Sequence, residues 1–175
     1  MPCDECGFSH SSLAIEDAPT ALRELGRRYR VPLTRGLKGE DLGALLRAHP
    51  LEGTWSALEY ACHYRDVLGI QRERLSIART QDGYAPEPMR REERVVELAY
   101  NSQEPALVAD DVAANAEALA AFVETFEPSE WKRTMTYNFP ERAERPLTWV
   151  VRHTVHEGEH HLLDIGRVLR AARGR

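Results

Sequence analysis

Residues 109–126 read ADDVAANAEALAAFVETF and carry the clearest helical pattern of the chain. Within them, apolar side chains recur at spacings of four, three, four and three residues: Val112, Ala116, Leu119, Val123 and Phe126. This spacing places all five on one face of an α-helix and predicts that the face is buried in a core. Pro128 follows two residues later, and the helix should end before it because proline cannot continue a helix.

Four other segments show helical signals, and they lie on both sides of this one: residues 19–31, 40–48, 54–78 and 148–172. Pro19 suits the first turn of a helix. The helical pattern that begins there is interrupted at Pro32. The third segment begins at Thr54 or Ser56. Ser56 and Glu59 have the spacing of a capping box, which would sit just inside the helix if Thr54 is the cap.

The connections between these helices are long. Residues 1–16 are irregular, residues 80–88 form a loop rich in glycine and proline, and residues 90–100 predict a short helix. Residues 131–146 are polar and aromatic without a helical period, which predicts either a long loop or a small hairpin. We therefore predict one all-α domain over residues 1–175, a helical bundle with long connections.

The composition excludes several classes of protein. The 175 residues are 42% hydrophobic and 29% charged, which is ordinary for one globular domain. A net charge of −5 offers no basic surface for nucleic acid, and no segment approaches the roughly 20 apolar residues of a membrane span. Three cysteines and the absence of a signal-peptide pattern favour the cytoplasm. We expect small-molecule partners and no binding to nucleic acid or to a membrane. The sequence does not decide whether the chain forms a homodimer.

Four of the seven histidines lie in the last predicted helix, within residues 153–161. His156 and His160 are four residues apart, so their side chains lie one above the other on one face. Two imidazoles at this spacing can reach one metal ion at roughly 2.0–2.1 Å. Such a pair also arises by chance, and structural histidines are commoner than ligands. A metal site therefore needs a third ligand from another helix.

His63 is the strongest candidate for that third ligand, because it lies in the middle of the helix predicted over residues 54–78. His10 lies near the N-terminus and His49 precedes a proline, so both are weaker candidates. We predict a divalent-metal site of His63, His156 and His160. Three protein ligands leave a coordination position open, as in catalytic rather than structural zinc sites.

Two acidic residues lie one helical turn from the predicted ligands. Glu59 precedes His63 and Asp164 follows His160. Each either accepts a hydrogen bond that orients an imidazole or faces solvent as an ordinary surface charge. The sequence does not separate these two interpretations.

Cys3 and Cys6 form a single C-x2-C pair, which is a weak metal signal without a second pair. His10 would add a third ligand for a separate structural zinc, and no fourth is evident from the spacing. An N-terminus with no metal or redox role is the simpler interpretation. Cys62 is next to His63, but it points about 100° away around the helix and is expected in the core.

Two stretches resemble the DinB-like superfamily of four-helix metal proteins, especially a subgroup common in actinobacteria. They are residues 54–67, TWSALEYACHYRDV, and residues 153–165, HTVHEGEHHLLDI. Tyr100 with residues 103–105, and residues 131–133, are also similar to that subgroup. The resemblance implies a four-helix bundle in which one histidine of the second helix and an H-x3-H pair of the last bind a divalent ion. Carried onto this sequence, these positions are His63, His156 and His160.

The resemblance also implies a function. Members of the family include metal-dependent transferases and isomerases that use a low-molecular-weight thiol, mycothiol in actinobacteria and bacillithiol in some Firmicutes. By this resemblance the chain is a thiol-dependent transferase or isomerase whose ion is Zn, Ni or Fe. A non-catalytic metal-binding stress or detoxification protein is the alternative. A purely structural helical module would require the three histidines to be a coincidence.

Overall fold

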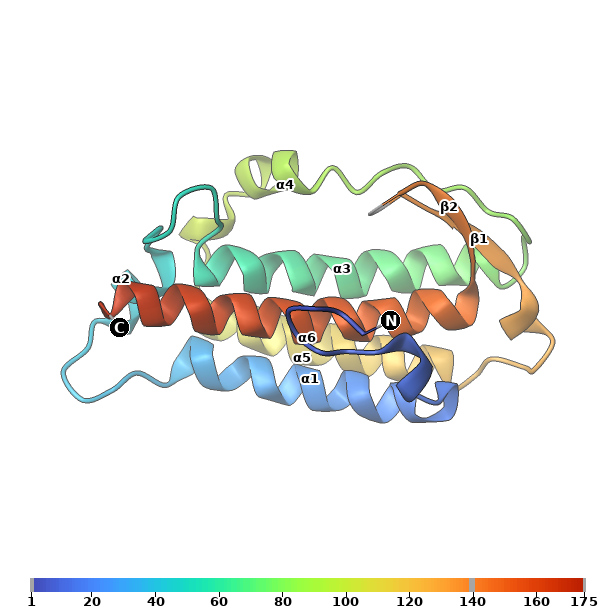
Figure 1. Ribbon diagram of the computed structural model, residues 1–175, viewed down its shortest axis with the longest axis horizontal. Helices are drawn as coiled ribbons and strands as arrows, with labels where there is room; N and C mark the ends of the chain where they lie inside the picture. Colours follow the sequence, from blue (N-terminus) through green and yellow to red (C-terminus); the bar gives the residue numbers. More distant parts are fainter. Residues whose placement is uncertain (1, 139–140, 175) are drawn as a thin grey trace.

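The computed structural model describes residues 2–138 and 141–174. Its framework consists of four long helices: α1 (Ala18–Thr34), α3 (Ala57–Ala78), α5 (Pro105–Val123) and α6 (Leu147–Ala172). The shorter elements are α2 (Leu42–Arg47), α4 (Arg91–Glu97), and the 3-10 turns η1 (His10–Ser12), η2 (Ile15–Asp17), η3 (Tyr100–Ser102) and η4 (Glu130–Lys132). The predicted bundle with long connections is therefore confirmed (Figure 1).

The four long helices form a closed ring. Helices α1 and α3 each pack against both α5 and α6, so the order around the bundle is α1, α5, α3, α6. Figure 1 shows that α3 and α5 run in one direction and that α1 and α6 run in the other. The connection over residues 79–104, which contains α4, returns the chain along the bundle so that α5 can run parallel to α3.

Local sequence signals set the helix ends. The Ser56 hydroxyl accepts the backbone N–H of Glu59 at 3.1 Å, and the Glu59 carboxylate accepts the N–H of Ser56 at 2.7 Å, so the capping box forms at the cap itself. Helix α5 begins earlier than predicted because Pro105 suits a first turn, where a missing N–H costs nothing. Pro32 lies in the last turn of α1, which ends at Thr34.

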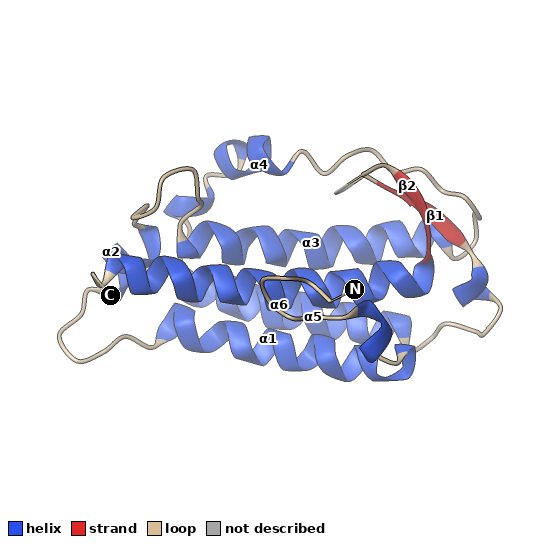
Figure 2. Ribbon diagram, in the orientation of Figure 1, coloured by secondary structure: helices blue, strands red, loops and turns tan. Residues whose placement is uncertain are grey.

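A two-stranded antiparallel hairpin precedes α6, which confirms the hairpin alternative for residues 131–146; residues 139–140 of that segment lie outside the described residues. Strand β1 (Thr134–Tyr137) pairs with β2 (Ala143–Pro146), with Met135 opposite Arg145. Figure 2 shows these strands at one end of the bundle. The side chain of Met135 is buried, and Gln71 of α3 donates a hydrogen bond to the Tyr137 hydroxyl at 3.0 Å, which ties the hairpin to the bundle.

The buried apolar residues of all four long helices form one cluster. Near its centre the rings of Tyr29 and Tyr64 stack with centroids 4.8 Å apart, and the Tyr29 hydroxyl donates a hydrogen bond to the carbonyl of Gly158 at 3.0 Å. Because Gly158 has no Cβ, the Tyr64 ring can lie directly against α6. Among the described residues, no helix is long and apolar enough to cross a membrane.

Candidate functional site

Helix α6 carries two pairs of potential metal ligands on two neighbouring stripes. His156 and His160 lie on one stripe, and Glu157 and His161 lie on the next. Each residue of an α-helix is turned by about 100° from the one before it, so the two pairs point in different directions. Glu157 and His161 meet a side chain of α3, whereas His156 and His160 meet the N-terminal loop, residues 2–9.

A group of three side chains joins α3 to α6: His63, Glu157 and His161. One ligand atom from each lies within 4.8 Å of the others. The Glu157 Oε2 atom is 3.9 Å from His63 Nε2 and 3.6 Å from His161 Nε2, and the two imidazole rings meet edge to face with centroids 5.1 Å apart. Two imidazoles and one carboxylate are a donor set that suits a divalent transition metal.

The charges in this group depend on one another. Burial would raise the pKa of Glu157, but contacts with the imidazoles of His153, His161 and His63 outweigh burial and hold that pKa well below its usual value. Burial disfavours the charged form of His161, yet contacts with Asp164 and Glu157 raise its pKa to about 9. Burial lowers the pKa of His63, which favours its neutral form. Its Nε2 atom faces the Glu157 carboxylate, so a neutral imidazole can offer this nitrogen to an ion.

Two cavities meet at this group. The larger encloses about 530 Å³, and its walls include the aromatic side chains of Trp55, Tyr60 and Trp149. The smaller encloses about 310 Å³, and His63 lines it. Glu157 lines both cavities, so its carboxylate lies between them. A ligand bound in the larger cavity would therefore contact Glu157 and His161, the two members of this group that belong to α6.

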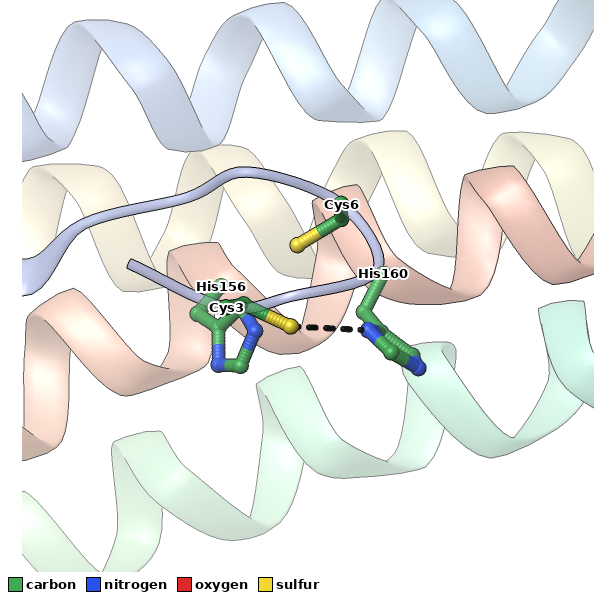
Figure 3. Close-up of side chains that lie close together, drawn as sticks. All are labelled: Cys3, Cys6, His156 and His160. Atoms are coloured by element: carbon green, nitrogen blue, oxygen red, sulfur yellow. Dashed lines mark hydrogen bonds between the residues drawn. The ribbon is translucent and has the colours of Figure 1, made fainter. Parts of the chain in front are cut away.

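A second group of four side chains lies on the other stripe of α6. Cys3 and Cys6 come from the N-terminal loop, His156 and His160 come from α6, and one ligand atom from each lies within 4.8 Å of the others. Figure 3 shows the two sulfur atoms on the side of the loop that faces the two imidazoles. The Cys3 Sγ atom is 3.7 Å from His160 Nδ1. The chain thus brings together residues that are more than 150 positions apart in sequence.

A tight turn presents the two sulfur atoms. The backbone N–H of Gly7 donates to the carbonyl of Cys3 at 2.9 Å, and the N–H of Cys3 donates to the carbonyl of Phe8 at 2.8 Å. Gly7 has a φ of +74°, a conformation that glycine adopts without strain. The Phe8 ring then stacks on the His156 ring with centroids 5.3 Å apart, which holds the loop against α6.

His10 and His153 line the larger cavity beside His156 and His160 of the second group. The His10 Nε2 and His153 Nδ1 atoms are 3.2 Å apart, and both rings stack on Trp149. Burial, and next the nearby His153, lower the pKa of His10 to about 4, so this imidazole is neutral near pH 7. His10 belongs to the cavity wall and not to a loose terminus.

The three predicted ligands do not form one group. His156 and His160 do lie together, as their spacing predicts, but they face Cys3 and Cys6. Within the described ranges, no group of ligand atoms closer than 4.8 Å joins His63 to either of them. The reason is helical geometry, because the residues of α6 that face His63 are one position further along the chain.

Glu59 and Asp164, whose roles the sequence left undecided, have different surroundings. The Glu59 carboxylate is occupied by the capping box and by His49 Nε2 at 2.8 Å, so it does not orient His63. Asp164 lies 3.1 Å from His161 Nδ1 and 3.8 Å from His160 Nε2. Asp164 can therefore orient an imidazole, which is one of the two alternatives that the sequence left open, and His161 is its nearer partner.

The sequence also contained a signal for the residues of α6 that lie beside His63. Glu157 and His161 form a second i, i+4 pair, interleaved with the first. The buried face of α6 includes Val151, Thr154, Val155, Gly158 and Ile165. On a helical wheel, the pair Glu157 and His161 lies closer to this face than the pair His156 and His160, so it was the better choice for contact with α3.

Solved structures with a similar fold support the architecture. YfiT from Bacillus subtilis, described as a probable metal-dependent hydrolase with an unusual four-helix bundle topology, superposes with a TM-score of 0.74 at 14% identity, over 95% of this chain and 91% of that one. A mycothiol-dependent maleylpyruvate isomerase superposes with a TM-score of 0.69 at 16% identity, over 91% of this chain and 63% of that one. A mutant form of such an isomerase gives a TM-score of 0.66 at 17% identity, over the same shares. These similarities show the fold alone.

Sequence comparison gives the family. No curated protein matches the chain significantly in sequence. The model of the DinB superfamily, in contrast, matches residues 33–165, which include α3, α5 and most of α6. With the family model over most of its length and the four-helix bundle that the relatives share, this chain belongs to the DinB superfamily.

Proposed function

We propose that this chain is a metal-dependent enzyme that holds a divalent ion among His63, Glu157 and His161. The observation that carries the proposal is this group itself, in which two imidazoles and a carboxylate from facing helices meet between two cavities, with Glu157 and His161 lining the larger and His63 lining the smaller. Two histidines with one glutamate are a known catalytic zinc set, and they leave a position open for a substrate. Zn, Ni and Fe all fit such donors.

His161 and Asp164 would prepare the group for an ion. Asp164 lies 3.1 Å from His161 Nδ1, so it can accept the hydrogen bond from that nitrogen and leave Nε2 directed at Glu157. A carboxylate that fixes a histidine in this way raises its strength as a ligand. His161 must lose its second proton before it can bind, so metal affinity should rise with pH.

We further propose that the substrates are a low-molecular-weight thiol and an electrophile. The reaction in the larger cavity would be either transfer of a group from the electrophile to the thiol or thiol-dependent isomerisation of the electrophile. When bound, the ion would supply the positive charge that lowers the pKa of the thiol. The aromatic walls of Trp55, Tyr60 and Trp149 would exclude water and strengthen that interaction. Mycothiol is the first thiol to test, because one structural relative depends on it. A cytoplasmic location fits the use of a reduced thiol.

The cavity also contains two arginines, Arg91 and Arg145. The guanidinium group of Arg145 lies over the Trp149 ring at 4.9 Å, at the wall of the cavity. Guanidinium groups recognise carboxylates, so we propose an electrophile that carries a carboxylate group. Uncharged electrophiles of the same size are the comparison in the assay.

The test compares Glu157→Gln with Glu159→Gln. Both substitutions remove one negative charge from α6, but Glu159 pairs with Arg28 outside the group. Metal content is measured by elemental analysis, and turnover is measured with mycothiol or bacillithiol and a panel of electrophiles. We expect Glu157→Gln and His63→Ala each to lose one metal equivalent and turnover, while Glu159→Gln keeps both.

Three results would contradict parts of this proposal. Full metal content in both His63→Ala and Glu157→Gln would show that this group does not bind the ion. Turnover without any thiol would show that the enzyme is a hydrolase and not a thiol-dependent transferase. Metal binding without turnover for either thiol would leave the alternative, a non-catalytic metal-binding stress or detoxification protein.

A further inference from the structure

We propose that Cys3, Cys6, His156 and His160 bind a second metal ion, zinc, in a closed structural site that fixes the N-terminal loop to α6. Two sulfur and two imidazole ligands are one of the standard sets of structural zinc sites. One ligand atom from each of the four residues lies within 4.8 Å of the others, which is close enough for all of them to surround one ion. This site is separate from the proposed catalytic ion and shares no ligand with it.

The turn of the N-terminal loop presents two thiols to α6. The N–H of Gly7 donates to the carbonyl of Cys3 and the N–H of Cys3 donates to the carbonyl of Phe8, and these two hydrogen bonds close the turn. Both sulfur atoms therefore lie on the side of the loop that faces the two imidazoles, where one ion could bind them (Figure 3).

His156 gives an independent reason for a ligand. Both of its ring nitrogens are buried, and neither has a hydrogen-bond partner among the described groups. A buried polar atom without a partner destabilises the folded protein, and a neutral imidazole has both an N–H donor and an acceptor nitrogen to satisfy. A metal ion bound to one nitrogen would remove most of this cost. Phe8, which stacks on the ring, offers no such partner.

Two other groupings compete for the same histidines and are weaker. His156 also lies near His10 and His153, but those two already contact each other at 3.2 Å and would give three ligands of one type. His160 also lies near Glu5 and Asp164, but Glu5 is exposed and is paired with Arg167 at 2.6 Å. The group that contains Cys3 and Cys6 has four ligands and is therefore preferred.

The second ion would have a consequence for the larger cavity. The N-terminal loop leads directly into His10, which stacks on Trp149 and lines that cavity. Fixing Cys3 and Cys6 to α6 would therefore hold one wall of the cavity in place. Loss of zinc should loosen this wall even when the proposed catalytic group is intact.

The experiment uses the full chain loaded with Co²⁺ or Zn²⁺ in three variants. They are the double variant Cys3→Ser with Cys6→Ser, the matched loop control Asp4→Ser, and Glu157→Gln. Asp4 is exposed and lies between the two cysteines. Thiolate bound to Co²⁺ gives a charge-transfer band that imidazole, carboxylate and water do not give.

We expect the charge-transfer band in the wild type, in Asp4→Ser and in Glu157→Gln. The double variant should lose the band and should also bind one zinc equivalent fewer than the wild type. A wild type without the band, or a double variant that keeps all its zinc, would overturn the proposal. Should the double variant fail to fold, thiol labelling of the wild type decides, because two further thiols must react after a chelator removes zinc. An oxidised Cys3–Cys6 pair in zinc-loaded protein would also overturn it. A band that survives in Glu157→Gln separates this site from the proposed catalytic one.

Discussion

Gly158 lies where α6 touches α1 and α3, and replacing it with alanine should destabilise the protein. A Cβ atom at this position would meet the Cζ and hydroxyl of Tyr64 at 2.5 Å each and Cδ1 of Leu25 at 2.8 Å. These contacts are far inside van der Waals distance, and the tyrosine is fully buried, so it has little room to move. Overpacking of this severity costs about 3 kcal/mol, whereas the better helix propensity of alanine returns about 1 kcal/mol.

The expected net loss is therefore about 2 kcal/mol in the free energy of unfolding, or roughly 4–8 °C in Tm for a chain of this length. Gly166→Ala is the matched control on the same helix, because its added Cβ would meet only the end of Arg170, at 3.9 Å. The control should gain up to about 1 kcal/mol. Urea unfolding followed by circular dichroism measures both variants. Gly158→Ala as stable as the wild type, or equal to Gly166→Ala, would refute the packing that brings Tyr64 against α6.

Two further predictions concern stability away from the site. Ser56→Ala removes the hydroxyl that accepts the N–H of Glu59 and should cost about 1 kcal/mol in urea unfolding; an unchanged midpoint would contradict the capping box. Asp66 is partly buried, and burial would raise its pKa, but hydrogen bonds from Tyr100 and Arg94 outweigh burial and lower it. Its stabilisation is thus present above the unfolded pKa of about 3.9 and lost as the pH falls through the lower folded value, so Asp66→Asn should flatten the acid side of the stability curve. An identical acid slope in both proteins would contradict this.

Much of the fold could be predicted because its signals are local. The apolar stripe that includes Val112 and Leu119 predicted α5, and the spacing of Ser56 and Glu59 predicted the start of α3 to within three residues. The segment before α6 was predicted as a loop or a hairpin because polar and aromatic residues there had no helical period. The start of α5 was missed by four residues, since Pro105 is compatible with a helix only at its first turn.

The site was harder to predict because its geometry depends on contacts between distant segments. The spacing of His156 and His160 correctly placed both on one face of α6, but it did not reveal which helix or loop lies opposite. The choice between this pair and the pair Glu157 and His161 depends on a rotation of about 100° around the helix. Cys3 meets His160 across 157 positions of sequence, and no local pattern predicts such a contact.

Anomalous diffraction at the zinc edge, from crystals of the zinc-loaded protein, tests the central claim most directly. Our account predicts a peak bounded by His63, Glu157 and His161, between α3 and α6. A further peak between Cys3 and His160 would test the structural site separately. No peak beside His63, or one ion that joins His63 to His156 and His160, would contradict the proposed catalytic centre.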